Sequence, residues 1–128
     1  LPICDTMAWN LNSDRPIFIQ IVERIEMDII SGKYKPGDKL PSVRDLAAEA
    51  AVNPNTMQKA FTELERTGLV FSQRTTGRFI TEDTSMIDEL KSTLAKDKIT
   101  ELLSFMQQLG FQENEILAMI GQTMKGEK

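Results

Sequence analysis

Polar and basic side chains gather in three short stretches of this sequence, and their types suit binding to a polyanion. Arginine, asparagine and glutamine can form paired hydrogen bonds with the edges of nucleic-acid bases, whereas lysine, serine and backbone amides bind phosphates. The stretches lie around residue 43, at residues 53–59 and at residues 74–78. The residues that we assign to nucleic-acid contact are Ser42, Arg44, Asn53, Pro54, Asn55, Thr56, Gln58, Lys59, Arg74, Thr75, Thr76, Gly77 and Arg78.

The chain offers little for catalysis or metal binding. It has one cysteine, Cys4, and no histidine, so it can build neither an intrachain disulfide, a His-based catalytic triad nor a Cys/His zinc site. Its carboxylates are scattered singly along expected helices, where solvated faces account for them. We therefore expect no enzymatic activity, no cofactor and no metal. No apolar run approaches the roughly 18 residues of a membrane helix, so we expect a cytoplasmic protein without a membrane span.

The charge of the chain differs between its parts. The whole sequence carries a net charge of -4, which by itself disfavours a nucleic-acid partner. Residues 33–80, however, hold eight basic and five acidic residues, a net charge of +3, which leaves 7 basic and 14 acidic residues, a net charge of -7, elsewhere. The basic excess thus coincides with the three polar stretches.

The elements that must position these residues can be read from caps and periodicity. A first helix should begin near Ser13 or Asp14, have Pro16 in its first turn and end at Gly32. We expect residues 1–12 to be irregular, assign no structural role to Leu1–Thr6, and expect a loop or very short strand at 33–40. The apolar face of this first helix comprises Phe18, Ile21, Val22, Ile25 and Ile29.

Two further helices and a hairpin follow. Ser42 and Asp45 resemble a capping box for a helix that ends near Ala51, and Asn53 with Pro54 begins another that Gly68 closes. Strand-like runs at 69–73 and 78–81 then flank a turn at 74–77. Two helices separated by a tight turn and followed by a hairpin form a winged helix-turn-helix. We place this domain at residues 13–81.

The remaining residues, 82–128, are expected to form a helical hairpin. One helix of about 25 residues should run from Thr84 to Gly110, and another from about Glu113 to Met124. Apolar faces on both helices must be buried against something. We predict a homodimer, and the alternative is packing against the chain's own winged helix. The predicted dimerisation residues are Ile87, Leu90, Leu94, Leu102, Met106, Leu109, Ile116, Leu117 and Ile120.

Residues 36–80 closely resemble the signature of the GntR family of bacterial transcription regulators. The matching residues are PGDKLPSVRDLA at 36–47, then Val52, Thr56, Ala60, Leu64 and Gly68-Leu69-Val70, then Gly77, Phe79 and Ile80. The resemblance implies a mostly α fold with a small β-hairpin wing. It also implies operator contacts at the positions of Arg44, Pro54, Asn55, Thr56 and Gln58. Arginine is common in the family at positions 54 and 58, glycine at 75 and threonine at 78, so base preference and wing geometry should differ here.

The short C-terminal region resembles the YtrA-like subfamily, whose helical tail serves dimerisation. The resemblance implies a sequence-specific, homodimeric repressor that binds a pseudo-palindromic operator in double-stranded DNA. One alternative is a winged helix used for protein-protein contact. Another is a regulator whose small-molecule effector, unknown in chemistry, sits at the dimer interface.

Overall fold

The computed structural model describes residues 9–126, which divide into two compact units that meet between Asp88 and Glu89. Cys4 and residues 1–6, for which the sequence analysis gave expectations, lie outside the described residues. The helices are α1 (Ile17–Ile30), α2 (Val43–Ala50), α3 (Pro54–Thr67), α4 (Thr84–Gln108) and α5 (Glu113–Met124), and the strands are β1 (Val70–Gln73) and β2 (Gly77–Ile80).

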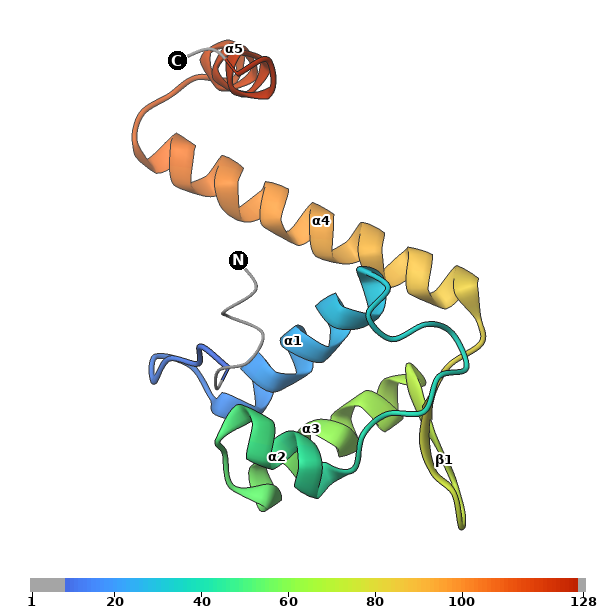
Figure 1. Cartoon of the computed structure of the whole chain (residues 1–128). Coiled ribbons are helices and arrows are strands. Elements are labelled where there is room, and N and C mark those ends of the chain that lie inside the picture. Colours follow the sequence, from blue (N-terminus) through green and yellow to red (C-terminus); the bar gives the residue numbers. More distant parts are fainter. Residues whose placement is uncertain (1–8, 127–128) are drawn as a thin grey trace. The chain divides into compact units, whose positions relative to one another are not determined.

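In the first unit, α3 is the central element, because α1, α2 and β1 all pack against it (Figure 1). Apolar residues spaced three or four apart on each helix point into this junction, as the sequence pattern predicts. The fully buried side chains include Ile21, Ile25, Leu46, Met57, Ala60, Phe61, Leu64, Val70 and Ile80. The core therefore fixes α3 from three sides and leaves its first turn exposed. Phe18 and Val22, also predicted on the apolar face of α1, are only half-buried.

The first helix begins later than the capping residues predict. Pro16, with φ -52° and ψ 133°, is the N-cap residue, and α1 begins at Ile17 instead of near Ser13 or Asp14. The residue before a proline is driven out of the helical region, which stops the helix at this point. The preceding chain is held by the buried Gln20, whose amide donates to the carbonyls of Asn12 at 2.7 Å and Arg15 at 2.9 Å.

Trp9 contributes to the first unit although residues 1–12 were expected to be irregular and no role was predicted for this side chain. Its indole is buried, and its Nε1 donates to a carboxylate oxygen of Glu49 at 3.0 Å. The guanidinium of Arg24 lies over the ring at 4.7 Å from its centre. The segment before α1 is thus attached to both α1 and α2 by one aromatic side chain.

The predicted N-cap residues of α2 and α3 are confirmed, although α2 shows only the Ser42 half of the capping-box pattern. Ser42 Oγ accepts from the backbone N-H of Asp45 at 3.0 Å, and Asn53 Oδ1 accepts from that of Asn55 at 2.7 Å. Pro54 is the first residue of α3, where its missing N-H costs no hydrogen bond. These caps fix where the first turns of α2 and α3 face solvent.

The wing is an antiparallel pair in which Val70 is opposite Ile80 and Ser72 is opposite Arg78. Its strands begin or end one residue away from the predicted bounds of 69–73 and 78–81. Lys39 pairs with Phe79 in an isolated bridge, so part of the predicted loop or short strand at 33–40 does extend the sheet. The chain entering α2 is therefore tied to the wing by backbone hydrogen bonds.

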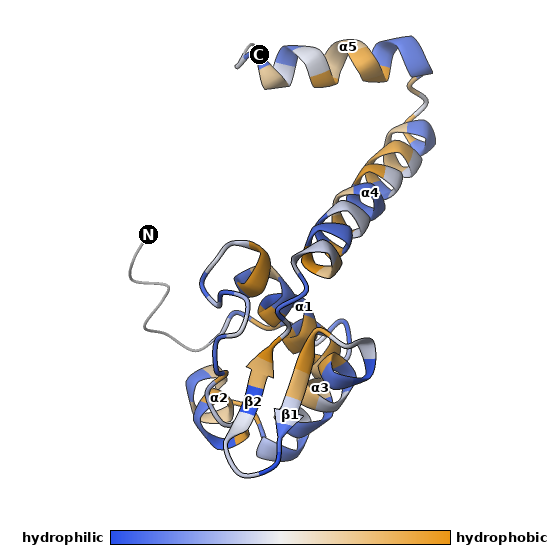
Figure 2. Cartoon of the chain, turned by 90° about the vertical axis from the view of Figure 1, so that its right-hand side faces the viewer, coloured by the Kyte–Doolittle hydropathy of each residue, from blue (hydrophilic) through white to orange (hydrophobic). Residues whose placement is uncertain are grey.

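In the second unit, α4 and α5 lie close to their predicted bounds, and a turn at Gly110, with φ 97°, separates them. Rather than running back along α4, α5 crosses its end (Figures 1 and 2). As a result, Met106 and Ile116 are the only buried residues in 89–126. Figure 2 shows hydrophobic residues recurring along both helices. The exposed ones are Ile99, Leu102, Leu103, Phe105, Leu109, Leu117, Met119 and Met124.

Candidate nucleic-acid interface

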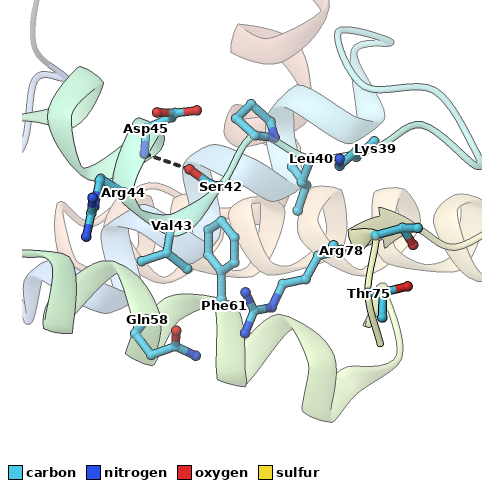
Figure 3. A pocket seen from close by; sticks show the side chains of 13 residues that line it. Lys39, Leu40, Ser42, Val43, Arg44, Asp45, Gln58, Phe61, Thr75 and Arg78 are labelled. Atoms are coloured by element: carbon cyan, nitrogen blue, oxygen red, sulfur yellow. Dashed lines mark hydrogen bonds between the residues drawn. The ribbon is translucent and has the colours of Figure 1, made fainter. Parts of the chain in front are cut away.

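A groove of about 820 Å³ opens between the N-terminus of α2, the middle of α3 and the wing (Figure 3). A different interaction positions each wall of the groove. The Ser42 cap sets where α2 begins, and packing against the core fixes α3. The turn that ends at Gly77 allows the second strand of the wing to return alongside the first. Of the predicted contact residues, the groove brings together Ser42, Arg44, Gln58, Thr75, Thr76, Gly77 and Arg78.

The other predicted residues lie outside the lining of the groove. Asn53, Pro54 and Asn55 are exposed at the start of α3, and Thr56 is half-buried there. Arg74 is exposed in the wing turn. The remaining residue, Lys59, is exposed, and its ammonium lies 4.2 Å from the ring centre of Phe18 on α1.

Arg44 is an exposed cation of the groove. It lies in the first turn of α2, and no carboxylate of residues 9–126 lies within 4 Å of its guanidinium. Figure 3 shows its side chain beside the groove, on the far side of Val43 from Arg78. An unpaired guanidinium at a helix N-terminus can make paired hydrogen bonds with a base edge or a phosphate.

Arg78 occupies a different environment from Arg44. Its side chain is 26% exposed, with Nε 3.3 Å from Oε1 of Glu65 and the guanidinium 5.1 Å from the ring centre of Phe61. Glu65 in turn accepts a hydrogen bond from the hydroxyl of Ser72. The sequence predicted Arg78 as a nucleic-acid contact and gave no sign of its pairing with Glu65.

Lys39 lines the groove but was not predicted as a site residue. The bridge between Lys39 and Phe79 places it beside the wing turn, where its ε-carbon lies only 3.0 Å from the position that a Cβ on Gly77 would take. Gly77 also has φ 115°, which disfavours any other residue. The possible short strand at 33–40 was the sequence signal that could have revealed this contact.

Acidic side chains collect in a separate hollow between α1 and α3, which shares no lining residue with the groove. There, burial raises the pKa of Glu26, and the neighbouring carboxylates of Glu23 and Glu63 raise it further. A hydrogen bond from Arg66, by contrast, lowers the pKa of Glu63. The first unit therefore separates a groove that holds three cations from an acidic hollow.

Within residues 9–126, no three acidic, cysteine or histidine side chains come together as they would need to for a metal ion. In the same residues, no helix has the length and apolar character required to cross a bilayer.

Comparison with known proteins bears on this arrangement. Residues 19–80 match the family described as bacterial regulatory proteins, gntR family. The HTH-type transcriptional regulator YhcF of Bacillus subtilis is 39% identical over 111 residues, which cover 87% of this chain and 92% of that protein. The chain belongs to the GntR family.

Other relatives extend the GntR assignment. The HTH-type transcriptional repressor YtrA of Bacillus subtilis is 41% identical over 97 residues, covering 76% of this chain and 70% of that protein. A GntR family transcriptional regulator from Listeria monocytogenes has a solved structure with a TM-score of 0.83 and 39% identity, covering 88% of this chain and 98% of that one. The predicted family, the winged-helix fold and the function of a DNA-binding transcription regulator are thereby confirmed.

Proposed function

We propose that this GntR regulator is a homodimeric repressor that binds a pseudo-palindromic operator in double-stranded DNA. The observation that carries the proposal is the groove, which joins the first turn of α2, α3 and the wing and contains Arg44 without an acidic partner among residues 9–126. Repression is supported by the similarity to YtrA, which is named a repressor. A repressor acts on DNA in the cytoplasm, where we place the protein.

Base edges would be read by residues on the first turns of α2 and α3. In helix-turn-helix proteins the N-terminal part of the second motif helix enters the major groove. Asn55 and Gln58 lie in that part of α3, and Arg44 lies beside it on α2. Asparagine and glutamine pair with adenine and arginine with guanine, so these residues would supply the sequence preference.

Phosphate contacts would hold the protein in register on the duplex. The exposed helix N-terminus at Ser42 presents backbone amides, and the exposed Arg74 and Lys39 flank the wing. Arg78 apart, we assign the rest of the predicted set to contacts that position the protein on the DNA backbone: Asn53, Pro54, Thr56, Lys59, Thr75, Thr76 and Gly77.

Dimerisation would use the second unit. Its exposed apolar side chains are more numerous than its buried ones, and such a surface on a small helical unit requires a partner. We therefore assign DNA binding to residues 13–81 and dimerisation to 82–128. Met106 and Ile116 are buried within this unit, so they would support the dimerisation surface without contacting the partner directly. Leu102, Leu109 and Leu117 are exposed and would form the surface itself. The half-buried residues of the predicted set are Leu90, Leu94 and Ile120 in the second unit and Ile87 at the end of the first.

Two winged helices related by a two-fold axis would reach half-sites about 34 Å apart, or a multiple of that distance. The test is fluorescence anisotropy with the DNA upstream of the protein's own gene, at fixed salt, against a duplex of the same composition in shuffled order. We expect preferential binding of the upstream DNA and lower expression of a reporter placed behind it. Equal affinity for both duplexes would favour the alternative of a winged helix used for protein-protein contact.

A thermal-shift screen with small molecules tests for an effector, because a bound ligand raises the melting temperature.

A further inference from the structure

The contact between Arg78 and α3 raises a question about the wing that the proposed function leaves open. Arg78 is a basic residue beside the wing turn, where a phosphate ligand would be expected. Its guanidinium nevertheless lies against the ring of Phe61, with Nε 3.3 Å from Glu65, and most of the side chain is withdrawn from solvent (Figure 3).

Glu65 holds both strands of the wing. One carboxylate oxygen pairs with Arg78 on β2, and the other accepts the hydroxyl hydrogen of Ser72 on β1. Ser72 and Arg78 face each other directly across the hairpin. The Glu65 side chain on α3 therefore contacts both members of one cross-strand pair. Because an isolated two-stranded hairpin is marginally stable, contacts of this kind decide how rigidly it is held.

We propose that Glu65, Ser72 and Arg78 form a clasp that fixes the wing against α3, and that Arg78 is a positioning residue for DNA binding and not a phosphate ligand. The inference rests on the proposed function, because operator binding is one of its readouts. It separates the two wing arginines: Arg74, exposed at the turn, contacts DNA, while Arg78 sets where the turn lies.

The sign of one charge change distinguishes a clasp from a phosphate contact. Replacing Glu65 by glutamine removes a negative charge beside the groove. If Arg78 were a phosphate ligand, this change would release it and strengthen DNA binding. If the three residues form a clasp, the same change loosens the wing and weakens DNA binding despite the more favourable charge.

The first experiment compares Glu65→Gln with Glu63→Gln by operator anisotropy. Glu63 is a matched control, since it is a carboxylate on the same helix whose partner is Arg66 and not the wing. We expect Glu65→Gln to weaken binding about threefold to tenfold, the range for weakening one structural hydrogen bond such as that from Ser72, because the ion pair with Arg78 is lost as well. Glu63→Gln should leave binding unchanged or slightly stronger. Unchanged or tighter binding by Glu65→Gln would overturn the clasp.

The second experiment compares the salt dependence of binding for Arg78→Met and Arg74→Met. Losing one phosphate contact lowers the slope of log affinity against log salt by about 1. We expect this decrease for Arg74→Met, whereas Arg78→Met should weaken binding with the wild-type slope. A decrease in slope for Arg78→Met would show that Arg78 contacts phosphate and would refute the assignment.

The third experiment needs no DNA. Backbone ¹⁵N relaxation of residues 70–80 should show increased motion of the wing in Glu65→Gln and the milder Ser72→Ala, with α1–α3 as an internal check of folding. Glu63→Gln should retain the wild-type rigidity. Unaltered wing dynamics in both clasp variants would overturn the inference even if operator binding is confirmed. Failure of the wild-type protein to bind the operator would instead defeat the proposed function.

Discussion

Individual arginines on the same groove have different environments, and formal charge alone does not reveal this. Arg44 has no carboxylate within 4 Å among residues 9–126, whereas Arg78 is paired with Glu65 and covers the ring of Phe61. Arg78 and Glu65 cancel within the net charge of +3 at residues 33–80, so the pairing lowers the number of basic side chains that can contact DNA and leaves the net charge unchanged. Specific contacts must supply a correspondingly larger share of the affinity.

Arg44→Ala should weaken operator binding by about 1–3 kcal/mol, the range for an arginine that makes paired hydrogen bonds with a base. Arg66→Ala is the control, because it removes the same charge from an exposed residue of α3 that hydrogen-bonds to Glu63 at 3.0 Å and does not line the groove. Anisotropy titrations at constant salt measure both. Equal losses for the two variants would mean that Arg44 acts only through its charge.

Glu26→Gln should raise the stability of the folded protein at pH 7. Burial and the neighbouring Glu23 and Glu63 raise the pKa of Glu26, so the folded state binds its proton more tightly than the unfolded state does. This difference stabilises the wild-type folded state fully at pH values below the ordinary glutamate pKa. The stabilisation is lost as the pH rises through the raised pKa of Glu26 in the folded protein. We expect a difference of less than about 1 kcal/mol, since the site is partly solvated. Thermal unfolding from pH 4 to pH 7 should show the advantage of the variant growing with pH, and a constant difference would contradict it.

Among the helices and strands, the boundaries set by turns and caps were predicted most accurately from the sequence. Ser42, Asn53 with Pro54, and Gly68 each act within a few residues of themselves, so α2 and α3 could be bounded from local chemistry. The burial of Trp9 and the pairing of Arg78 with Glu65 depend on segments that approach only after folding. The late start of α1 was a competition between two local signals, in which Pro16 outweighed the capping residues before it. The groove itself arises from three elements, and its lining includes Lys39, which the sequence did not single out, while Asn53, Asn55 and Arg74 lie outside the lining.

The turn between α2 and α3 contains a residue in an unfavourable conformation. Ala51 ends α2 with φ 60° and ψ 47°, the left-handed region that glycine adopts more easily. Ala51→Gly should therefore stabilise the protein by about 0.5–1 kcal/mol, after allowance for the greater freedom of glycine in the unfolded chain. Urea unfolding measures the change. A loss of stability would show that the methyl group of Ala51 contributes packing that outweighs its backbone strain.

For the whole molecule, the exposed apolar side chains of the second unit connect oligomeric state to DNA affinity. Two linked half-site contacts act at a high effective concentration, so a dimer can bind an operator far more tightly than its single winged helices. A low positive charge on each winged helix makes this linkage more important, because non-specific attraction is weak and is screened by salt.

Replacing Leu102 and Phe105 together by Asp should produce monomers in light scattering while the helical circular dichroism is retained. These side chains are 43% and 57% exposed, so charges there oppose association without entering a core. Gln107→Asp, an exposed polar position on the same helix, is the control and should remain dimeric. Met106→Asp should instead destabilise the unit itself, because Met106 is buried. A Leu102/Phe105 variant that stays dimeric would place the interface elsewhere.

Trp9 gives the protein a built-in optical signal. It is the only tryptophan in the chain, so all indole emission arises from one ring that lies under the guanidinium of Arg24 and donates to Glu49. Emission should move to longer wavelength when the ring enters water. The segment before α1 can therefore be monitored without any label, and a spectral change on adding DNA or a metabolite would report that this segment has separated from α1 and α2.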